Sequence, residues 1–439
     1  MRTPLAFALL SAALVLYSCK ITDNPDEVSD NAPITIASPS PATPISKMSL
    51  TDTQARNVEA GNSFAINCFK DLYGKGSKDL VFSPLSLQYV LALTVNGASG
   101  ETAAEITRAL GFGEDIDALN AYCNLLLNEL PALDPTIVLQ LADAVLVNNM
   151  FSVQDSFRNT VETVYYAPVE YVDATNPKRV VERINEWASR NTNGFINPFL
   201  DEEEVSGNFA SILLNTLYFK AQWGIIEGMA IFNSSSTKKG DPFYYDDGRE
   251  GVADYLVSSR HFRYGRLGEN GIVELPYADG NYAMYILLPD KRDNNSLSHL
   301  VSSLSAENWK AALLSMTSTA KVNLCFPRFE VVNKTDLTDI VRGQGIHSAF
   351  DPARARFDRM LVASDADGPF YVQKVLQKAR IIVSEWGTEA GAVTVEVMTG
   401  EGPENPQTID FYANHPFAYI VAEKTTGVIL FEGVYTGKK

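Results

Sequence analysis

The chain has 439 residues, of which 46% are hydrophobic and 20% charged, with 28 Gly and 21 Pro. This composition is globular and supplies a sizeable core, so it excludes collagen-like, low-complexity and wholly disordered proteins. The formal net charge of −17 argues against a nucleic-acid partner, because phosphate binding requires Lys and Arg to displace counterions.

The pattern of the first residues is typical of a targeting segment. Arg2 forms a short basic region, and residues 5–17 form an apolar run that is too short to span a membrane as a helix. The run ends in a small residue followed by Cys19, which resembles a bacterial lipobox, where the chain is cut before the cysteine and the thiol is lipidated. We therefore expect a signal peptide at 1–18 and a lipid on Cys19. An ordinary secretory signal, giving a secreted protein, is the alternative.

Residues 19–48 are rich in Pro, Ser, Thr and Asp without periodicity, which predicts a flexible tether. Such a tether suits a globular domain over 49–439 that is held at a membrane by acyl chains. We expect a location in the cell envelope, anchored by lipid in the outer membrane on its periplasmic or its surface-exposed face.

Helical spacing of apolar residues dominates the first third of the globular part. It occurs over 51–70, 87–95 and 101–110. Between the first two helices a short strand ends at Ser83, which is suited to cap a helix, and Pro84 is suited to the first helical position.

Strand patterns dominate from residue 137 onward, interrupted by a helix over 180–190. The predicted strands are 137–148, 211–223, 322–331 and 380–385, with hairpins formed by 273–277 with 282–289 and by 417–422 with 427–434. Helices first and strands later, without βαβ alternation, predict an α+β fold.

Motifs for catalysis are missing from the sequence. The four His residues show no HExxH or metal-ligand spacing, and there is no GxSxG and no Gly-rich phosphate loop. Cys68, Cys123 and Cys325 lack CxxC spacing and are expected to be buried free thiols. We therefore expect neither enzymatic activity nor a cofactor or metal.

The informative segment follows the strand at 380–385. Residues 387–392 are mostly small, 393–397 are rich in Val and Thr, and 400–406 have the composition of an exposed loop. A β-prone stretch near solvent is an aggregation liability. Its retention suggests a strand that lies outside a sheet, from Gly387 onward, and joins the sheet later.

Residues 385–392, EWGTEAGA, resemble the hinge of an inhibitory serpin, whose usual pattern is Glu-Glu-Gly-Thr-Glu followed by small residues. The hinge residues would be Glu385, Gly387, Thr388, Glu389, Ala390, Gly391 and Ala392.

Other blocks agree with that resemblance, which extends in order from about residue 50 to 439. Ser83 and Ser86 resemble the family's shutter serines, Asn215 its shutter asparagine and Trp223 its breach tryptophan. Residues 184–194 resemble the helix beneath which the reactive loop must pass.

The resemblance implies one domain of three β-sheets and about eight or nine helices, with an exposed reactive-centre loop. Its native state would be metastable. A target serine protease, or a cysteine protease, of host or microbial origin would cut the loop and become trapped as an acyl-enzyme, while the cut loop inserts into the main sheet. The inhibitor would act as a monomer.

Two positions and one stretch depart from the family pattern. Gln377 stands where many serpins have His, and we expect its amide to bridge Ser83 and Asn215. Trp386 replaces a usual acidic residue beside the expected position of Trp223. The stretch 224–231 is longer than usual.

The sequence gives more than one candidate for the bond that the protease cuts. Counting sixteen residues on from Glu385, the usual family spacing, gives the Glu401–Gly402 bond. Counting back from Pro416 gives Asn405, and Met398 or Thr399 would suit proteases of other specificity. Two alternative functions also remain: a serpin without inhibitory activity, and a surface-binding lipoprotein such as an adhesin or sugar binder.

Overall fold

The computed structural model describes residues 47–76, 78–205, 209–233, 235–278, 280–362, 370–388 and 408–437. Within these ranges nine α-helices form: α1 (Asp52–Gly74), α2 (Pro84–Asn96), α3 (Gly100–Ala109), α4 (Ile116–Glu129), α5 (Asp155–Val164), α6 (Pro177–Asn191), α7 (Ser296–Ser303), α8 (Ala306–Ser315) and α9 (Thr338–Gly343). Two short 3-10 helices lie at Glu202–Glu204 and Ser348–Phe350.

Six strands form what we call the main sheet. In spatial order they are β14 (Phe329–Asp336), β16 (Leu376–Ser384), β17 (Gly387–Thr388), β5 (Ser211–Gln222), β2 (Val138–Asn148) and β4 (Val169–Val172). Only the β2–β4 pair among these is parallel. The two residues of β17 thus separate the longer strands β16 and β5.

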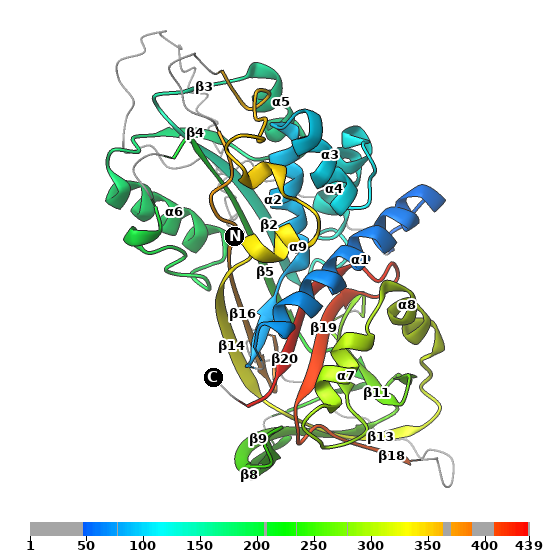
Figure 1. Ribbon diagram of the computed structural model, residues 1–439. Coiled ribbons are helices and arrows are strands. Elements are labelled where there is room, and N and C mark those ends of the chain that lie inside the picture. The colour runs from blue at the N-terminus through cyan, green and yellow to red at the C-terminus, as the bar shows by residue number, and fades with distance from the viewer. Residues whose placement is uncertain are drawn as a thin grey trace, which may run out of the picture. The chain divides into compact units, whose positions relative to one another are not determined.

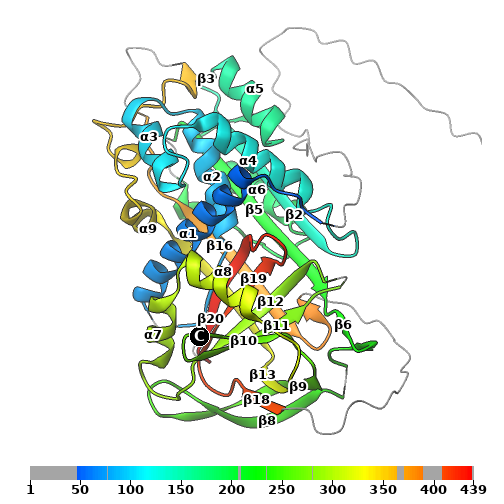
Figure 2. The same cartoon turned by 90° about the vertical axis from the view of Figure 1, so that its right-hand side faces the viewer.

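A second six-stranded sheet, the core sheet, is almost completely buried. Its order is β1 (Leu80–Phe82), β20 (Ile429–Tyr435), β19 (Phe417–Glu423), β12 (Tyr282–Leu288), β11 (Asn270–Pro276) and β10 (Tyr264–Leu267). Helices α1, α7 and α8 pack against it (Figures 1 and 2). Its strands are mostly apolar on both faces because helices and the main sheet cover them, with Glu274, Glu423 and Glu432 as buried exceptions.

The small sheet has the order β18 (Thr408–Tyr412), β13 (Lys321–Pro327), β9 (Glu250–Arg260) and β8 (Thr237–Tyr244). Two further ladders are short: β3 (Ser152–Val153) pairs with β15 (Leu361–Val362), and β6 (Ile225–Ile226) pairs with β7 (Met229–Ala230).

Helix α2 connects the two large sheets. It contacts both β5 and β20, and most of its residues are buried around its whole circumference, as expected for a helix enclosed by other elements. Ser83 caps it by accepting a hydrogen bond from the Ser86 backbone N–H, and Pro84 occupies its first turn, as the sequence predicts.

The α+β prediction is confirmed, with three main sheets and, among the described residues, nine helices. One predicted strand was wrong: residues 322–331 change sheets at Arg328, with β13 in the small sheet and β14 in the main sheet. The unusually long stretch after Trp223 forms the short β6–β7 hairpin. Its two-residue turn consists of Glu227 and Gly228, whose φ angles are both positive, 57° and 72°.

The thiols of Cys68 and Cys123 are buried and free, as predicted, whereas Cys325 is only half-buried. None of the helices in the described ranges combines the length and apolarity that a membrane-spanning segment needs.

Candidate functional site

The hinge begins inside the main sheet rather than outside it. After β16 the chain turns at Glu385 and Trp386, and Gly387 and Thr388 then pair with both neighbours: Thr388 lies opposite Val383 of β16 and Ala221 of β5. The expectation that the chain leaves the sheet at Gly387 is therefore wrong by two residues. The other hinge positions, Glu389, Ala390, Gly391 and Ala392, lie outside the described residues, as do Cys19 and the candidate bond at Glu401 and Gly402.

Only glycine fits at position 387. Its φ is +130°, a conformation that other residues rarely adopt, and a Cβ there would approach the Ala221 carbonyl oxygen to 2.1 Å. The glycine of the hinge motif therefore allows the chain to pass close to β5 as it turns back into the sheet.

Thr388 is held by an aromatic group that the sequence analysis did not assign. Its Oγ1 lies 2.6 Å from the hydroxyl oxygen of Tyr277, and the side chain is 3% exposed. The Tyr277 ring stacks on Trp223 with 4.8 Å between centroids and 6° between planes. Burial raises the pKa of Tyr277, so its hydroxyl stays protonated and neutral.

Trp223 and Trp386 lie together, as predicted. The Trp223 indole N–H donates to the Ser384 carbonyl at 2.7 Å, and its backbone N–H donates to the Trp386 carbonyl at 3.4 Å. Trp223 therefore ties the end of β5 to the turn that precedes β17. We call Trp223, Tyr277 and Thr388 the breach cluster.

Glu385 anchors the turn to other elements. Its Oε1 accepts from Thr237 of β8 at 3.2 Å and pairs with Arg328 at 3.3 Å. Its Oε2 is buried and has no hydrogen-bond partner among the described residues. Because Arg328 is where the chain changes sheets, this ion pair links the hinge to both the small and the main sheet.

A second polar group, the shutter cluster, consists of Ser83, Ser86, Asp143, Asn215 and Gln377. Within the described residues, the Gln377 side chain hydrogen-bonds to the backbone of Ser83: Oε1 accepts from its N–H at 3.0 Å, and Nε2 donates to its carbonyl at 2.8 Å. The predicted bridge from Gln377 to Asn215 was therefore wrong. A hydrogen bond between Ser86 and Asn215 makes the connection instead.

Asp143 completes the shutter cluster and was missed by the sequence analysis. It lies directly opposite Asn215 in the β2–β5 ladder, and its Oδ1 accepts from Asn215 Nδ2 at 2.7 Å. Burial raises the pKa of Asp143 to about 7, although the Asn215 hydrogen bond partly opposes this effect. Asp143, the one charged residue in the predicted strand 137–148, was the available signal.

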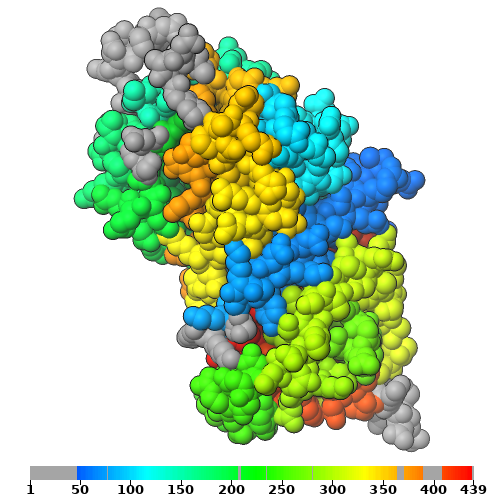
Figure 3. Space-filling view, in the orientation of Figure 1, coloured from blue at the N-terminus to red at the C-terminus, as the bar shows by residue number. Residues whose placement is uncertain are grey.

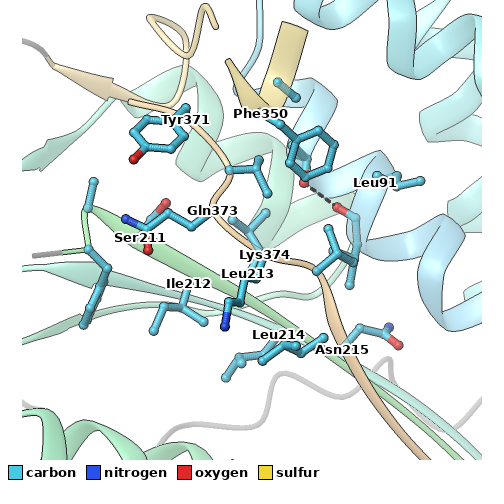
Figure 4. Close-up of a pocket in the computed structure, with 18 of the residues that line it drawn as sticks. Leu91, Ser211, Ile212, Leu213, Leu214, Asn215, Phe350, Tyr371, Gln373 and Lys374 are labelled. Atoms are coloured by element: carbon cyan, nitrogen blue, oxygen red, sulfur yellow. Dashed lines mark hydrogen bonds between the residues drawn. The ribbon is translucent and has the colours of Figure 1, made fainter. Parts of the chain in front are cut away.

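Beside the shutter cluster the main sheet holds a cavity of about 490 Å³. Its walls are Ser211–Asn215 of β5, the segment 370–377 and the buried side of α2. Figure 4 shows Ser211 to Asn215 along one strand, with Gln373 and Lys374 on the facing segment and Phe350 and Leu91 behind. Within the described residues no ladder pairs β16 directly with β5, so the two strands are already parted here.

The segment 195–204 after α6, which we call the strap, covers this gap. Asn185 Oδ1 of α6 accepts from the backbone N–H groups of Phe199 and Leu200 at 2.7 and 2.9 Å. Lys378 of β16 donates to the Pro198 carbonyl at 2.6 Å, and Lys334 of β14 pairs with Asp201 at 2.9 Å. In Figure 3 an orange surface lies between a green surface on its left and a yellow surface on its right.

Comparisons with known proteins agree with this geometry. A family model described as serpin (serine protease inhibitor) matches residues 59–437. Serpin B8 of Homo sapiens is 30% identical over 389 residues, covering 86% of this chain and 98% of the relative. Serpin-ZXA of Oryza sativa subsp. japonica is 30% identical over 373 residues, covering 82% and 90%.

Among solved structures, the thermophilic serpin tengpin in its native state superposes with a TM-score of 0.77 at 26% identity, covering 90% of this chain and 97% of tengpin. The family model spans most of the chain, and the described residues have the three main sheets and the helices that the resemblance implies. The chain belongs to the serpin family, whose members are in general inhibitors rather than enzymes.

Proposed function

We propose that this serpin inhibits serine endopeptidases, and cysteine endopeptidases in addition, by acting as a suicide substrate. The nucleophile of the protease attacks the carbonyl carbon of Glu401, the bond to Gly402 breaks, and the Gly402 nitrogen leaves with a proton. The ester, or thioester, that remains joins the protease to the loop. Insertion of the freed loop then traps this acyl-enzyme before water reaches it.

The observation that carries this proposal is the register of β17. Thr388 lies opposite Ala221 and Val383. If the strand continues in the same register, Thr394 falls opposite both Asn215 and Gln377, and residues 394–398 fall opposite Asn215–Ser211. These are the residues that line one wall of the cavity. The gap in the sheet therefore lies where the cut loop would add its new strand.

A covalent complex tests the proposal. Mixing the protein with a panel of serine and cysteine proteases should give an SDS-stable band with at least one of them. Ala390→Arg should convert the inhibitor into an ordinary substrate, because a charged side chain cannot enter the sheet at that position. Gln407→Arg, beyond the candidate bond, should still give the band.

Mass spectrometry of the released peptide identifies the bond that is cut. Glu401–Gly402 is the expected site, and cleavage after Met398, Thr399 or Asn405 would reassign it. Clean cleavage by every protease without any stable band would contradict inhibition and would support a serpin without inhibitory activity.

We further propose that the mature protein begins at Cys19 and is anchored in the cell envelope by acyl groups on that residue. The short apolar run and the tether-like composition that follows it support this proposal. Metabolic labelling with a radioactive fatty acid should mark the wild-type protein, and Cys19→Ser should remove the label and release the protein from membranes. A labelled Cys19→Ser protein would contradict lipidation at this site.

A further inference from the structure

The hairpin formed by β6 and β7 contributes no residue to the breach cluster or to the shutter cluster. It begins two residues after Trp223, and its base is bonded on both sides. The Gly224 backbone N–H donates to the Pro276 carbonyl at 2.8 Å, and the Ile231 backbone N–H donates to the Gly224 carbonyl at 3.4 Å. Ile231 is buried, so the chain returns to the core directly after β7. The base of the hairpin is therefore fixed.

The tip of the hairpin is fixed as well. Glu227 adopts a φ of 57°, a conformation that favours Asn or Gly at the first position of such a turn. Its carboxylate accepts a hydrogen bond from the His261 backbone N–H at 3.3 Å and also pairs with the His261 ring. These bonds lower the pKa of Glu227, so its carboxylate is ionised at neutral pH. Because His261 directly follows β9, this contact ties the tip of the hairpin to the small sheet.

Ile225 is an exposed apolar residue on this fixed hairpin. Its neighbour Ile226 packs against the core, and the alternation of side chains along a strand turns Ile225 outward, where it is 58% exposed. Figure 2 shows β6 at the edge of the molecule, outside the stacked sheets. Single exposed apolar residues are common on protein surfaces, so the place of Ile225 in the molecule decides what it can contact.

Both ends of the reactive-centre loop are anchored close to this hairpin. At one end Thr388 pairs with Ala221, which precedes Ile225 by four residues, or at most about 14 Å of chain. At the other end the first residues of β18 lie level with the end of β9 at Arg260, two strands away, which is about 10 Å. A protease domain of about 230 residues has a radius of gyration of about 17 Å. A protease that engages the loop between these two anchors therefore comes within reach of Ile225.

We propose that Ile225 is a docking contact for the protease that cuts the reactive-centre loop. The partner that fits it is a protease with an apolar side chain on the rim of its active-site cleft, because Ile225 offers apolar surface and no hydrogen bond. The fixed base and tip mean that little conformational freedom is lost when the protease covers the hairpin. This proposal rests on the proposed cleavage of the loop, and it adds a determinant of specificity that lies outside the loop sequence.

The rate at which the intact chain is cut tests this contact, whether or not inhibition follows. Glutamyl endopeptidase, chymotrypsin and elastase are the probes, since they suit the candidate bonds after Glu401, Met398 and Thr399. With at least one of them, Ile225→Asp should lower the second-order rate constant for loss of the intact chain about fivefold or more, because it places a charge in an apolar contact. Ile225→Leu keeps the apolar surface and should be cut at the wild-type rate.

Met150→Asp is the matched control. Met150 is 76% exposed and follows β2 at the end of the main sheet that holds Ser211, far along β5 from Ala221. This substitution adds the same charge away from the loop anchors and should leave the rate unchanged.

The outcomes separate the docking contact from the proposed function. Equal rates for wild type and Ile225→Asp with all three proteases, or an equal loss in Met150→Asp, would overturn the docking contact even if an SDS-stable band forms. Slower cutting of Ile225→Asp without any stable band would support the contact and contradict inhibition. A loop that resists all three proteases would remove the cleavage on which both proposals rest.

Discussion

At the scale of single residues, the buried carboxyl of Asp143 gives the shutter cluster a titratable group, because Gln377 occupies a position where His would be expected to titrate. Among the described residues, Asn215 alone hydrogen-bonds the Asp143 carboxyl, through Oδ1. The other oxygen, Asp143 Oδ2, is buried and has no partner there. Its folded-state pKa of about 7 lies above the ordinary value of 3.8. The folded protein therefore keeps a proton that the unfolded chain releases.

This shift in pKa predicts that the free energy of unfolding falls as pH rises. The contribution of Asp143 is fully present below about pH 4 and is lost as pH rises through about 7, an effect on the order of 4 kcal/mol. Asp143→Asn keeps the acceptor for Asn215 and should remove this part of the slope in melting temperature measured from pH 4 to 8. Glu269→Gln, at an exposed carboxylate in the turn before β11, should leave the slope intact. An unchanged slope in Asp143→Asn would contradict the assignment.

A second buried carboxyl, Glu432 of β20, predicts a stabilising substitution. The residue is fully buried, both carboxyl oxygens lack partners among the described residues, and burial raises its pKa well above the ordinary value. Glu432→Met removes the unsatisfied oxygens and conserves length, so it should stabilise the protein by about 1–3 kcal/mol and raise the melting temperature. Glu432→Gln keeps two unsatisfied polar atoms and should not. Equal effects of the two substitutions would refute this explanation.

At the scale of elements, the breach cluster determines how firmly β17 is held in the main sheet. The hydrogen bond between Tyr277 and Thr388 joins two buried side chains, and such a bond is worth about 1 kcal/mol. Tyr277→Phe should therefore speed hydrogen exchange at residues 385–388 about fivefold, as measured by mass spectrometry. Tyr255→Phe, which removes a hydroxyl from the small sheet, is the control.

Thr388→Val completes a double-mutant cycle for this contact. Because either substitution alone breaks the same bond, the double variant should exchange no faster than the faster of the two single variants. Additive effects in the double variant would show that the bond between these side chains does not hold β17.

The sequence was enough to predict elements whose signals are local. Ser83 and Pro84 mark the start of α2, and the turn around residue 280 marks the β11–β12 hairpin. It was not enough where the outcome depends on distant partners. Beyond Pro327 the apolar positions shift from even (Val322, Leu324, Phe326) to odd (Phe329, Val331), which marks a break near Arg328 but does not reveal which sheet each half joins. Gln377 has the right chemistry to bond Asn215, but the Ser83 backbone occupies both its amide oxygen and its amide nitrogen.

At the scale of the whole molecule, the proposed insertion between the parted strands β5 and β16 implies that the uncleaved chain does not have its most stable arrangement. A strand from the cut loop would fill the cavity, add two ladders of hydrogen bonds and bury apolar side chains such as Val395 and Val397. On this proposal, the stability of the uncleaved chain is set by the rate of unfolding or insertion rather than by equilibrium.

Cleavage in the loop should therefore raise the melting temperature by more than about 10 °C. The measurement is calorimetry at a fixed scan rate on intact and protease-cut protein, with Ala392→Arg as the matched variant that is cut but cannot insert. The cut wild type should also protect residues 389–398 from hydrogen exchange, since a new central strand is bonded on both sides. A cut wild-type protein that melts like the intact one, with that stretch still exchanging freely, would leave the gap between β5 and β16 unfilled and would exclude the trapping mechanism.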